Sequence, residues 1–445
     1  MLSVRGHVLR MAALAWPIIV AELGWMSMGL VDTVMVGPLG KEAIGAVGVA
    51  NILYDTFGIF SLGLLLGLDP LVAQAFGAGR PAEANRYLRQ GVWLALFLTP
   101  PTMVMALSLP VLMQWIGVQG EVRALAEPYI LALSTGTLPL LLYAAFRRFL
   151  QATNRVRPVM IALVSANLIN AGANYVLIHG AWGLPAFGVT GSGWATAAAR
   201  VFLAGALIVA TYWDDVTGLW AKGQRWGKPR LDDLRELLRL GAPAAGQIGL
   251  EIAVFGAATM LAGRLSTASL AAHHIALNMA GVTFMVPLGI SSAGAVAVGQ
   301  ALGRGEPEEA KRAGWVALGF AASFMMVAGG VFALAPQLVL GAFTDDPELL
   351  AIGVGLLRIA AMFQLFDGLQ VAATGVLRGA AETRLPMLAN LAGHWALGLP
   401  LGYYLCFARG MDAAGLWAGL SVGLIVVAVV LVWQWWRLPL RPVSS

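Results

Sequence analysis

Several acidic residues lie inside long apolar segments of this sequence, and Asp32, Glu251 and Asp367 are the main candidates among them; Glu22 and Asp55 also lie in such segments. A charged side chain at the centre of a bilayer costs about 3 kcal/mol or more, so such residues usually bind ions or substrates. Gln247 and Gln364 lie within one helical turn of Glu251 and Asp367, on the same helix faces. This pattern predicts groups that bind a cation or a cationic substrate; the alternative is that the carboxyl groups only join helices by hydrogen bonds.

Three further polar residues lie in apolar segments, two asparagines and a histidine. Asn170 and Asn174 are four residues apart, so a helix would present both amides to one point. Such a pair can line a polar cavity or coordinate a cation, or it can bond to neighbouring helices. His394 lies in another apolar segment, and histidine titrates near neutral pH, so both a functional role and a packing role stay open.

The amino-acid composition indicates that these segments lie in a lipid bilayer. Of the 445 residues, 59% are hydrophobic and only 11% are charged, against about 25% charged in soluble proteins. A helix of about 20 apolar residues crosses the hydrocarbon core. We therefore predict an all-α membrane protein with twelve transmembrane helices. They are placed at residues 9–37, 44–70, 90–115, 127–147, 158–179, 189–212, 238–262, 270–297, 314–338, 350–377, 386–407 and 413–436.

Basic residues predict the orientation of these spans. Most of the 28 Lys and Arg residues fall in the alternate connections that share a side with both termini. The other side holds only Lys41, Arg123, Arg264, Arg358 and Arg409, and Arg200 lies within a span. Because cytoplasmic loops carry the excess of Lys and Arg, both termini are predicted to be cytoplasmic, in a multi-pass protein of the plasma (inner) membrane.

The sequence also repeats itself after a shift of about 226 residues. The clearest match pairs Gln74-Ala-Phe-Gly-Ala-Gly-Arg-Pro with Gln300-Ala-Leu-Gly-Arg-Gly-Glu-Pro. We predict two six-helix lobes, at residues 1–213 and 238–445, joined by a cytoplasmic linker at 214–237. Six spans per lobe make the repeat parallel, and transporters use the cavity between such lobes for alternating access.

Several other classes of function lack their signatures. The glycines at positions 77, 79, 303 and 305 are predicted to break helices, and Pro81 and Pro307 to start new ones. These turns have no Gly-Lys-Ser/Thr and follow no strand, so we do not expect a P-loop. No His/Cys group has metal-ligand spacing, and no serine is set up with a histidine and an acid. We therefore expect no enzyme, no cofactor and no nucleic-acid partner, and transport driven by an ion gradient.

The motifs together resemble the multidrug and toxic compound extrusion (MATE) family, in its NorM-like branch. The matching stretches include Met28-Gly-Leu-Val-Asp-Thr33, Ala271-Ala-His-His-Ile-Ala-Leu-Asn278 and Gln364-Leu-Phe-Asp-Gly-Leu-Gln-Val371. The resemblance implies a two-lobed MATE/MOP-type fold and a cation-coupled antiporter that exports organic, often cationic and aromatic, compounds. Glu22 departs from the family pattern, because a neutral residue is expected there.

The resemblance also implies roles for single residues. Glu251 and Asp367 would bind the coupling ion, H⁺ or Na⁺, or the substrate. Asp32 would lie in the N-terminal lobe, with Asn170 and Asn174 as a matching asparagine pair. The expected partners are small organic cations and membrane lipid, and we expect a monomer. The alternatives are a lipid-linked oligosaccharide flippase of a related fold, which would need a cationic cavity, and a membrane receptor or enzyme.

Overall fold

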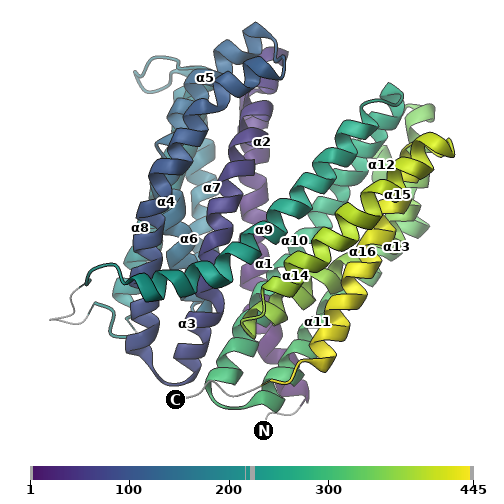
Figure 1. Ribbon diagram of the computed structural model, residues 1–445. Coiled ribbons are helices and arrows are strands. Elements are labelled where there is room, and N and C mark those ends of the chain that lie inside the picture. Colours follow the sequence, from purple (N-terminus) through teal and green to yellow (C-terminus); the bar gives the residue numbers. More distant parts are fainter. Residues whose placement is uncertain (1–3, 216, 221–225, 441–445) are drawn as a thin grey trace. The chain divides into compact units, whose positions relative to one another are not determined.

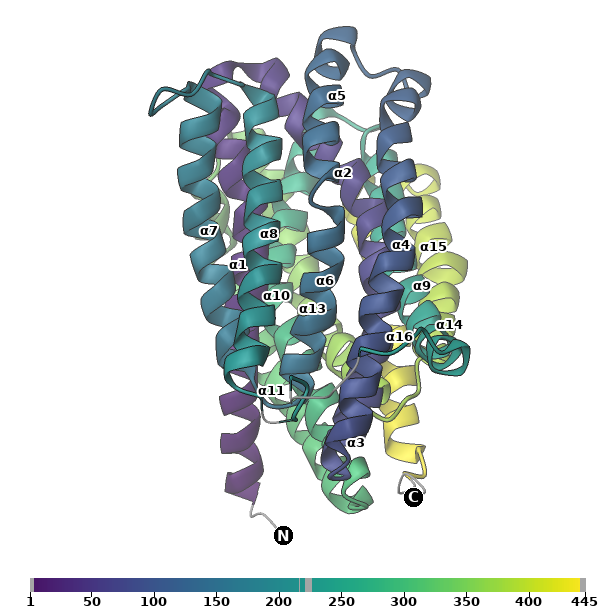
Figure 2. The same ribbon diagram turned by 90° about the vertical axis from the view of Figure 1, so that its left-hand side faces the viewer.

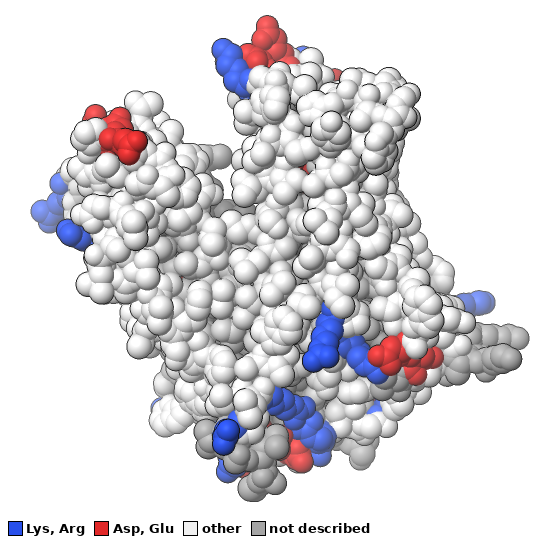
Figure 3. All heavy atoms as spheres, turned by 180° about the vertical axis from the view of Figure 1, so that it is seen from behind, with Lys and Arg blue, Asp and Glu red and all other residues white. Residues whose placement is uncertain are grey.

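A computed structural model describes residues 4–215, 217–220 and 226–440, and the regular structure in these ranges is helical without a strand. This is the expected outcome for a chain in lipid, where a helix satisfies its own backbone hydrogen bonds. Large apolar side chains such as Leu30, Val104 and Leu168 are more than 60% exposed. On the face shown in Figure 3, charged side chains gather toward the helix ends and most of the surface between them is uncharged. The chain is a multi-pass membrane protein.

The helices follow the predicted segments closely. The first half contains α1 (Val4–Val36), α2 (Lys41–Leu64), α3 (Leu68–Gly77), α4 (Pro81–Trp115), α5 (Gly120–Ser134), α6 (Thr137–Ala152), α7 (Val156–His179) and α8 (Val189–Trp213). The second half contains α9 (Leu231–Ala262), α10 (Thr267–Gly303), α11 (Pro307–Leu334), α12 (Pro336–Gly341), α13 (Pro347–Gly379), α14 (Arg384–Asn390), α15 (Leu399–Tyr403) and α16 (Asp412–Arg437).

Ten helices of the described chain are long and apolar enough to span a membrane, and the pair α5 and α6, bent by 48°, makes an eleventh. The twelfth predicted span, 386–407, is also helical, but two π-helical segments interrupt it: η3 (Leu391–Gly398) and η4 (Tyr404–Ala408). Its backbone packs closely on α16, since a Cβ atom on Gly419 would lie 2.2 Å from the backbone nitrogen of Gly402. All twelve predicted spans are therefore helical.

The chain divides into two compact units. One consists of the described residues of Val20–Ala245, in which α7 packs on α8 and α4 packs on α6 (Figures 1 and 2). The other combines the described residues of Met1–Ile19 and Gly246–Ser445, in which α13 packs on α10, α11 and α16. The lobe limits that the sequence repeat suggests, 1–213 and 238–445, stay a prediction. Helix α9 begins at Leu231, so the end of the predicted linker is helical.

Each half contributes the start of its first helix to the unit of the other half. Residues 4–19 of α1 belong with the second half, and residues 231–245 of α9 belong with the first. Ile19 and Ala245 are equivalent under the repeat, and so are the glycines against which they pack, Gly289 and Gly63. The internal repeat therefore extends from the sequence to the contacts.

Those two glycines are sites of close backbone approach, which leads to a stability prediction. A Cβ atom at Gly63 would lie 2.6 Å from the Cα of Ala245, and one at Gly289 would lie 2.9 Å from the Cα of Ile19. We expect Gly63→Ala and Gly289→Ala each to destabilise the protein by about 1–3 kcal/mol, because backbone atoms cannot move aside as side chains do. Thermal unfolding in detergent, followed by tryptophan fluorescence, would show a lower melting temperature.

The matched control is Gly256→Ala, at a helical glycine of α9 with no atom within 4 Å of the added Cβ. Alanine is the better helix former there by up to about 1 kcal/mol. We expect its melting temperature to equal or exceed that of the wild type. Equal melting temperatures for Gly63→Ala and Gly256→Ala would contradict the steric argument.

The glycine-rich turns of the repeat adopt matching conformations. Helix α3 ends at Gly77 and α10 ends at Gly303, and a new helix begins four residues later at Pro81 and Pro307, respectively. Between them Gly79 and Gly305 have φ angles of 68° and 76°, in the left-handed region that glycine adopts readily. The turns are thus helix breaks, as the sequence predicts, and proline starts the following helix.

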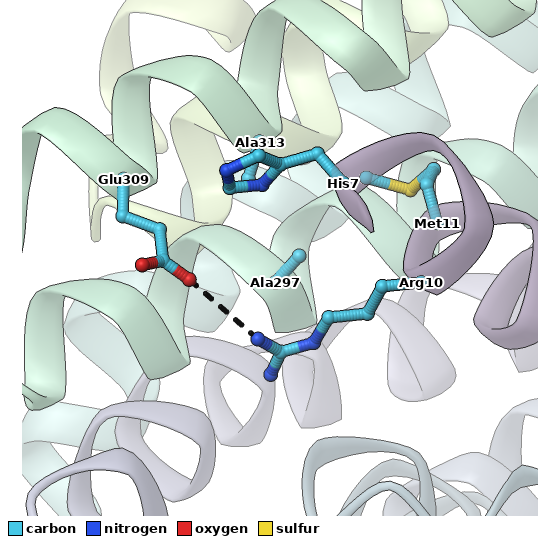
Figure 4. Close-up of a pocket in the computed structure, with 6 residues that line it drawn as sticks. All are labelled: His7, Arg10, Met11, Ala297, Glu309 and Ala313. Carbon is cyan, nitrogen blue, oxygen red and sulfur yellow. Dashed lines mark ion pairs between the residues drawn. The ribbon is translucent and has the colours of Figure 1, made fainter. Parts of the chain in front are cut away.

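The start of α1 rests on α10 and α11 beside a small pocket lined by His7, Arg10, Met11, Ala297, Glu309 and Ala313 (Figure 4). Arg10 donates a hydrogen bond to Gln300 (3.0 Å) and forms an ion pair with Glu309 (3.7 Å). The repeat equivalents of Arg10 and Ala313 are Glu236 and Tyr87, and the Tyr87 hydroxyl donates to Glu236 at 3.1 Å. The pocket is therefore lined by Ala313, whose equivalent in the first half of the chain is the much larger Tyr87.

Candidate functional site

The first polar cluster surrounds Asp32 in the unit of residues 20–245. Asp32 is only 2% exposed. Its Oδ1 accepts hydrogen bonds from the amides of Asn170 (3.1 Å) and Asn174 (2.7 Å), and its Oδ2 accepts one from Thr196 (2.7 Å). Three predicted residues from two helices thus meet, and a threonine joins them. Each donor helps to replace the water that this carboxylate has lost.

Helix geometry explains this cluster. Asn174 follows Asn170 by one turn on α7. The Asn174 amide also donates to the Asn170 side-chain oxygen at 3.1 Å. Helix α8 packs on α7 and brings Thr196 to the other carboxylate oxygen. Sequence reasoning missed Thr196, because one threonine in a run of small residues carries no signal of its own. Carboxylate, amide and hydroxyl oxygens are the ligands that hard cations such as Na⁺ accept.

Glu22 forms a buried ion pair with Arg147 of α6 in the same unit. Both side chains are less than 10% exposed, and Arg147 also donates to the hydroxyl of Tyr143 (3.4 Å). The Tyr143 ring in turn stacks on Trp25 with centroids 6.0 Å apart. The charge of Glu22 is therefore already balanced by a basic side chain of the protein. This pairing shows how an acid at this position is accommodated within an apolar segment.

Arg200, the basic residue within a span, is held by its neighbours. It lies four residues after Thr196 on α8 and is 5% exposed. Its guanidinium donates to the Tyr54 hydroxyl (3.1 Å) and lies over the Tyr54 ring, 4.9 Å from the centroid. A cation over an aromatic face is attracted by the ring quadrupole. Arg200 is thus engaged in packing α8 on α2 in this unit.

The second polar cluster lies in the other unit, on α9, α10 and α13. The Gln370 amide donates to Glu251 at 3.3 Å, and the Gln247 amide donates to Thr374 at 3.3 Å. Gln364 donates to Thr283 of α10. Gln247 and Glu251 of α9 thus each bond to a residue of α13, and Gln364 of α13 bonds to α10. Asp367 lies between Gln364 and Gln370 on α13, three residues from each. The two threonines were not predicted, for the same reason as Thr196.

Glu251 and Asp367 belong to neighbouring helices, because Gln370, one turn after Asp367 on α13, donates to Glu251 of α9. Asp367 is 3% exposed and accepts no hydrogen bond from the residues that the structure describes. Among the residues that the structure describes, neither Glu251 nor Asp367 forms an ion pair with Lys or Arg. The contrast with the first cluster is clear, because Asp32 has three hydrogen-bond donors and Glu22 has an arginine. Two neighbouring carboxylates that lack a basic partner are suited to take up a proton or a cation.

Comparison with known proteins gives the family. The MatE family model matches residues 17–176 and again residues 243–404, at the offset that the repeat predicts. The chain is 37% identical to the "Probable multidrug resistance protein NorM" of Mesorhizobium japonicum, with 96% of this chain and 92% of that protein covered. It is also 37% identical to the "Multidrug resistance protein NorM" of Burkholderia vietnamiensis, over 97% of this chain and 94% of that one.

Solved structures agree on the fold. The eukaryotic MATE transporter AtDTX14 superposes with a TM-score of 0.89 at 21% identity, covering 98% of this chain and 97% of that one. The bent form of the Vibrio cholerae MATE transporter VcmN superposes with a TM-score of 0.86 at 18% identity, with the same coverage. These likenesses confirm the predicted all-α, twelve-helix fold class. With the matches of the family model and of the NorM proteins, they establish that the chain belongs to the MatE family, in its NorM-like branch.

Proposed function

We propose that this protein is a cation-coupled multidrug efflux antiporter that exports organic, often aromatic, cations from the cytoplasm across the plasma membrane. The names of its NorM relatives and its membership of the family support efflux. The single observation that carries the coupling is the pair Glu251 and Asp367, two carboxylates linked through Gln370 and without a basic partner in the described chain. The asymmetric distribution of Lys and Arg supports cytoplasmic termini.

The chemistry of exchange follows from the charge of that pair. Two ionised carboxylates in a medium of low dielectric constant repel each other, and a bound cation relieves the repulsion. A proton, a Na⁺ ion and an organic cation can each do so, and they compete for the same negative charge. On the outer side the coupling ion displaces the drug; on the inner side the ion leaves and the bare carboxylates attract a new drug cation. In this proposal Gln247, Gln364 and Gln370 orient the acids.

The cluster around Asp32 is proposed as a second cation-binding group. The side chains of Asp32, Thr196, Asn170 and Asn174 converge there, and each carries an oxygen that can coordinate a cation. A cation such as Na⁺ would take the place of the hydrogen-bond donors that now satisfy Asp32. No cofactor is needed for such exchange, and the protein is proposed to act as a monomer.

The test is transport by the purified protein in liposomes loaded with ethidium. A pH gradient is imposed without Na⁺, and separately a Na⁺ gradient is imposed at equal pH, with the membrane potential clamped by valinomycin and K⁺. We expect efflux under one of the two gradients, which names the coupling ion, and none after an ionophore collapses that gradient. Absence of transport under both, by protein with a sharp unfolding transition, would refute multidrug antiport and direct the search to lipid-linked substrates.

A further inference from the structure

His394 is a buried histidine whose ring nitrogens are both without a hydrogen-bond partner in the described part of the chain. It lies in the π-helical segment η3 and is 1% exposed. A neutral imidazole has one donor and one acceptor, and leaving such a group buried and unpaired costs about 1–3 kcal/mol. π-Helical turns are rare and are frequent at functional sites. Both features point to a residue that is retained for a use other than stability.

A second buried histidine of the same unit shows what a structural role looks like. His273 is fully buried. Its Nδ1 accepts a hydrogen bond from Trp417 (3.0 Å), and its Nε2 lies 2.9 Å from the Thr259 hydroxyl. Because the tryptophan nitrogen can only donate, Nδ1 carries no proton, and Nε2 carries it and donates to Thr259. His273 is thus fully satisfied in one neutral tautomer, whereas His394 offers both ring nitrogens to a ligand.

The surroundings of His394 identify the kind of ligand. The ring centroids of His394 and Phe255 are 6.4 Å apart. Those of Phe255 and Phe363 are 6.2 Å apart. Phe255 follows Glu251 by one turn on α9, and Phe363 precedes Asp367 by one turn on α13. A binding site for a small organic molecule combines apolar and aromatic walls with a few polar groups that fix orientation. His394 is such a polar group beside two aromatic rings.

The π-helical segment is anchored beside the same acids. The indole nitrogen of Trp395, the residue after His394, donates to the backbone carbonyl of Leu250 at 3.0 Å. Leu250 immediately precedes Glu251. The position of His394 is therefore tied to the helix turn that carries the proposed coupling carboxylate.

We propose that His394 is a specificity-determining residue, whose unprotonated ring nitrogen accepts a hydrogen bond from an N–H group of the transported cation. Phe255 and Phe363 stack on the flat part of that molecule, and Glu251 and Asp367 balance its charge. This assignment rests on the proposed function, the export of organic cations. It selects amine, aniline and amidine cations, which carry N–H groups, over quaternary cations that carry none.

The test compares His394→Phe, which keeps a flat ring without a polar atom, with His394→Gln, which keeps a hydrogen-bond acceptor. The transported probe is ethidium, an aromatic cation with amino groups, and tetraphenylphosphonium, which has no N–H group, serves as its competitor. Losing one hydrogen bond in a buried site weakens binding about tenfold. We expect His394→Phe to raise the KM for ethidium about tenfold with kcat within about twofold of wild type. We expect His394→Gln to keep the KM within about threefold.

The inhibition constant of tetraphenylphosphonium should be equal within about twofold in all three proteins. An unchanged KM in His394→Phe, an equal rise in both variants, or a parallel loss of tetraphenylphosphonium inhibition would overturn the assignment. If tetraphenylphosphonium does not inhibit the wild type, the difference between the two variants decides alone. His394→Leu replaces His394→Phe if the latter does not reach the folded yield of the wild type. A wild type that fails to export ethidium refutes the proposed function itself, which is a separate result.

Discussion

Replacing Glu251 by glutamine is expected to abolish gradient-driven efflux, with a loss of at least about tenfold in the rate. The substitution keeps the size of the side chain and an oxygen that can accept the hydrogen bond from Gln370, so the fold should persist. It removes the negative charge that the coupling ion and the drug cation share in our proposal. Losing one charge interaction worth more than 1.4 kcal/mol changes an equilibrium more than tenfold. Ethidium efflux from liposomes under the effective gradient measures this directly.

Two companion variants make the result specific. Asp367→Asn should have the same effect, because the two acids would share one cation. Glu308→Gln, at an exposed position in the first turn of α11, should transport at the wild-type rate. Normal efflux by Glu251→Gln, with the coupling ion unchanged, would remove Glu251 from the mechanism and leave the cluster around Asp32 as the remaining candidate.

Breaking the buried pair of Glu22 and Arg147 is expected to cause the largest loss of stability. Removing one partner of a buried ion pair leaves an uncompensated charge and costs about 3–5 kcal/mol. We therefore expect Arg147→Met to lower the melting temperature strongly. The double variant Glu22→Leu with Arg147→Met should recover most of the loss, since apolar replacements of a whole buried pair are often neutral. Thermal unfolding of the two single variants and the double variant gives the coupling energy as a double-mutant cycle.

The control is an exposed pair in the same unit. Arg123 and Glu127 lie one turn apart on α5 with nitrogen and oxygen 3.7 Å apart, and about a third to a half of each side chain is exposed. Exposed pairs contribute at most about 1 kcal/mol, so Glu127→Gln should leave the melting temperature nearly unchanged. The double variant at Glu22 and Arg147 should also retain gradient-driven efflux. Loss of coupling in that folded double variant would show that Glu22 is an ion site and that its pairing with Arg147 is only part of its role.

Much of the fold could be read from the sequence because lipid leaves the backbone few choices. A long apolar segment must become a helix to satisfy its own hydrogen bonds, so the twelve predicted spans became helical even where π turns interrupt the one at residues 386–407. The repeat likewise predicted the helix breaks at Gly79 and Gly305, because glycine and proline act locally. The acids were identified because a carboxylate in an apolar segment is rare and costly.

The partner of each polar side chain was decided only by the tertiary structure. Glu22 and Arg147 are 125 residues apart, and nothing local in either segment indicates that they meet. The same holds for Thr196, which joins Asp32 across 164 residues. Two histidines in similar apolar segments also differ in this way. His273 has two hydrogen-bond partners, whereas neither ring nitrogen of His394 has a hydrogen-bond partner in the described chain. The sequence by itself determined which segments are helices and which of them carry polar groups. Which groups are satisfied, and which stay free to bind, depended on how the helices pack, because these contacts join residues far apart in the chain.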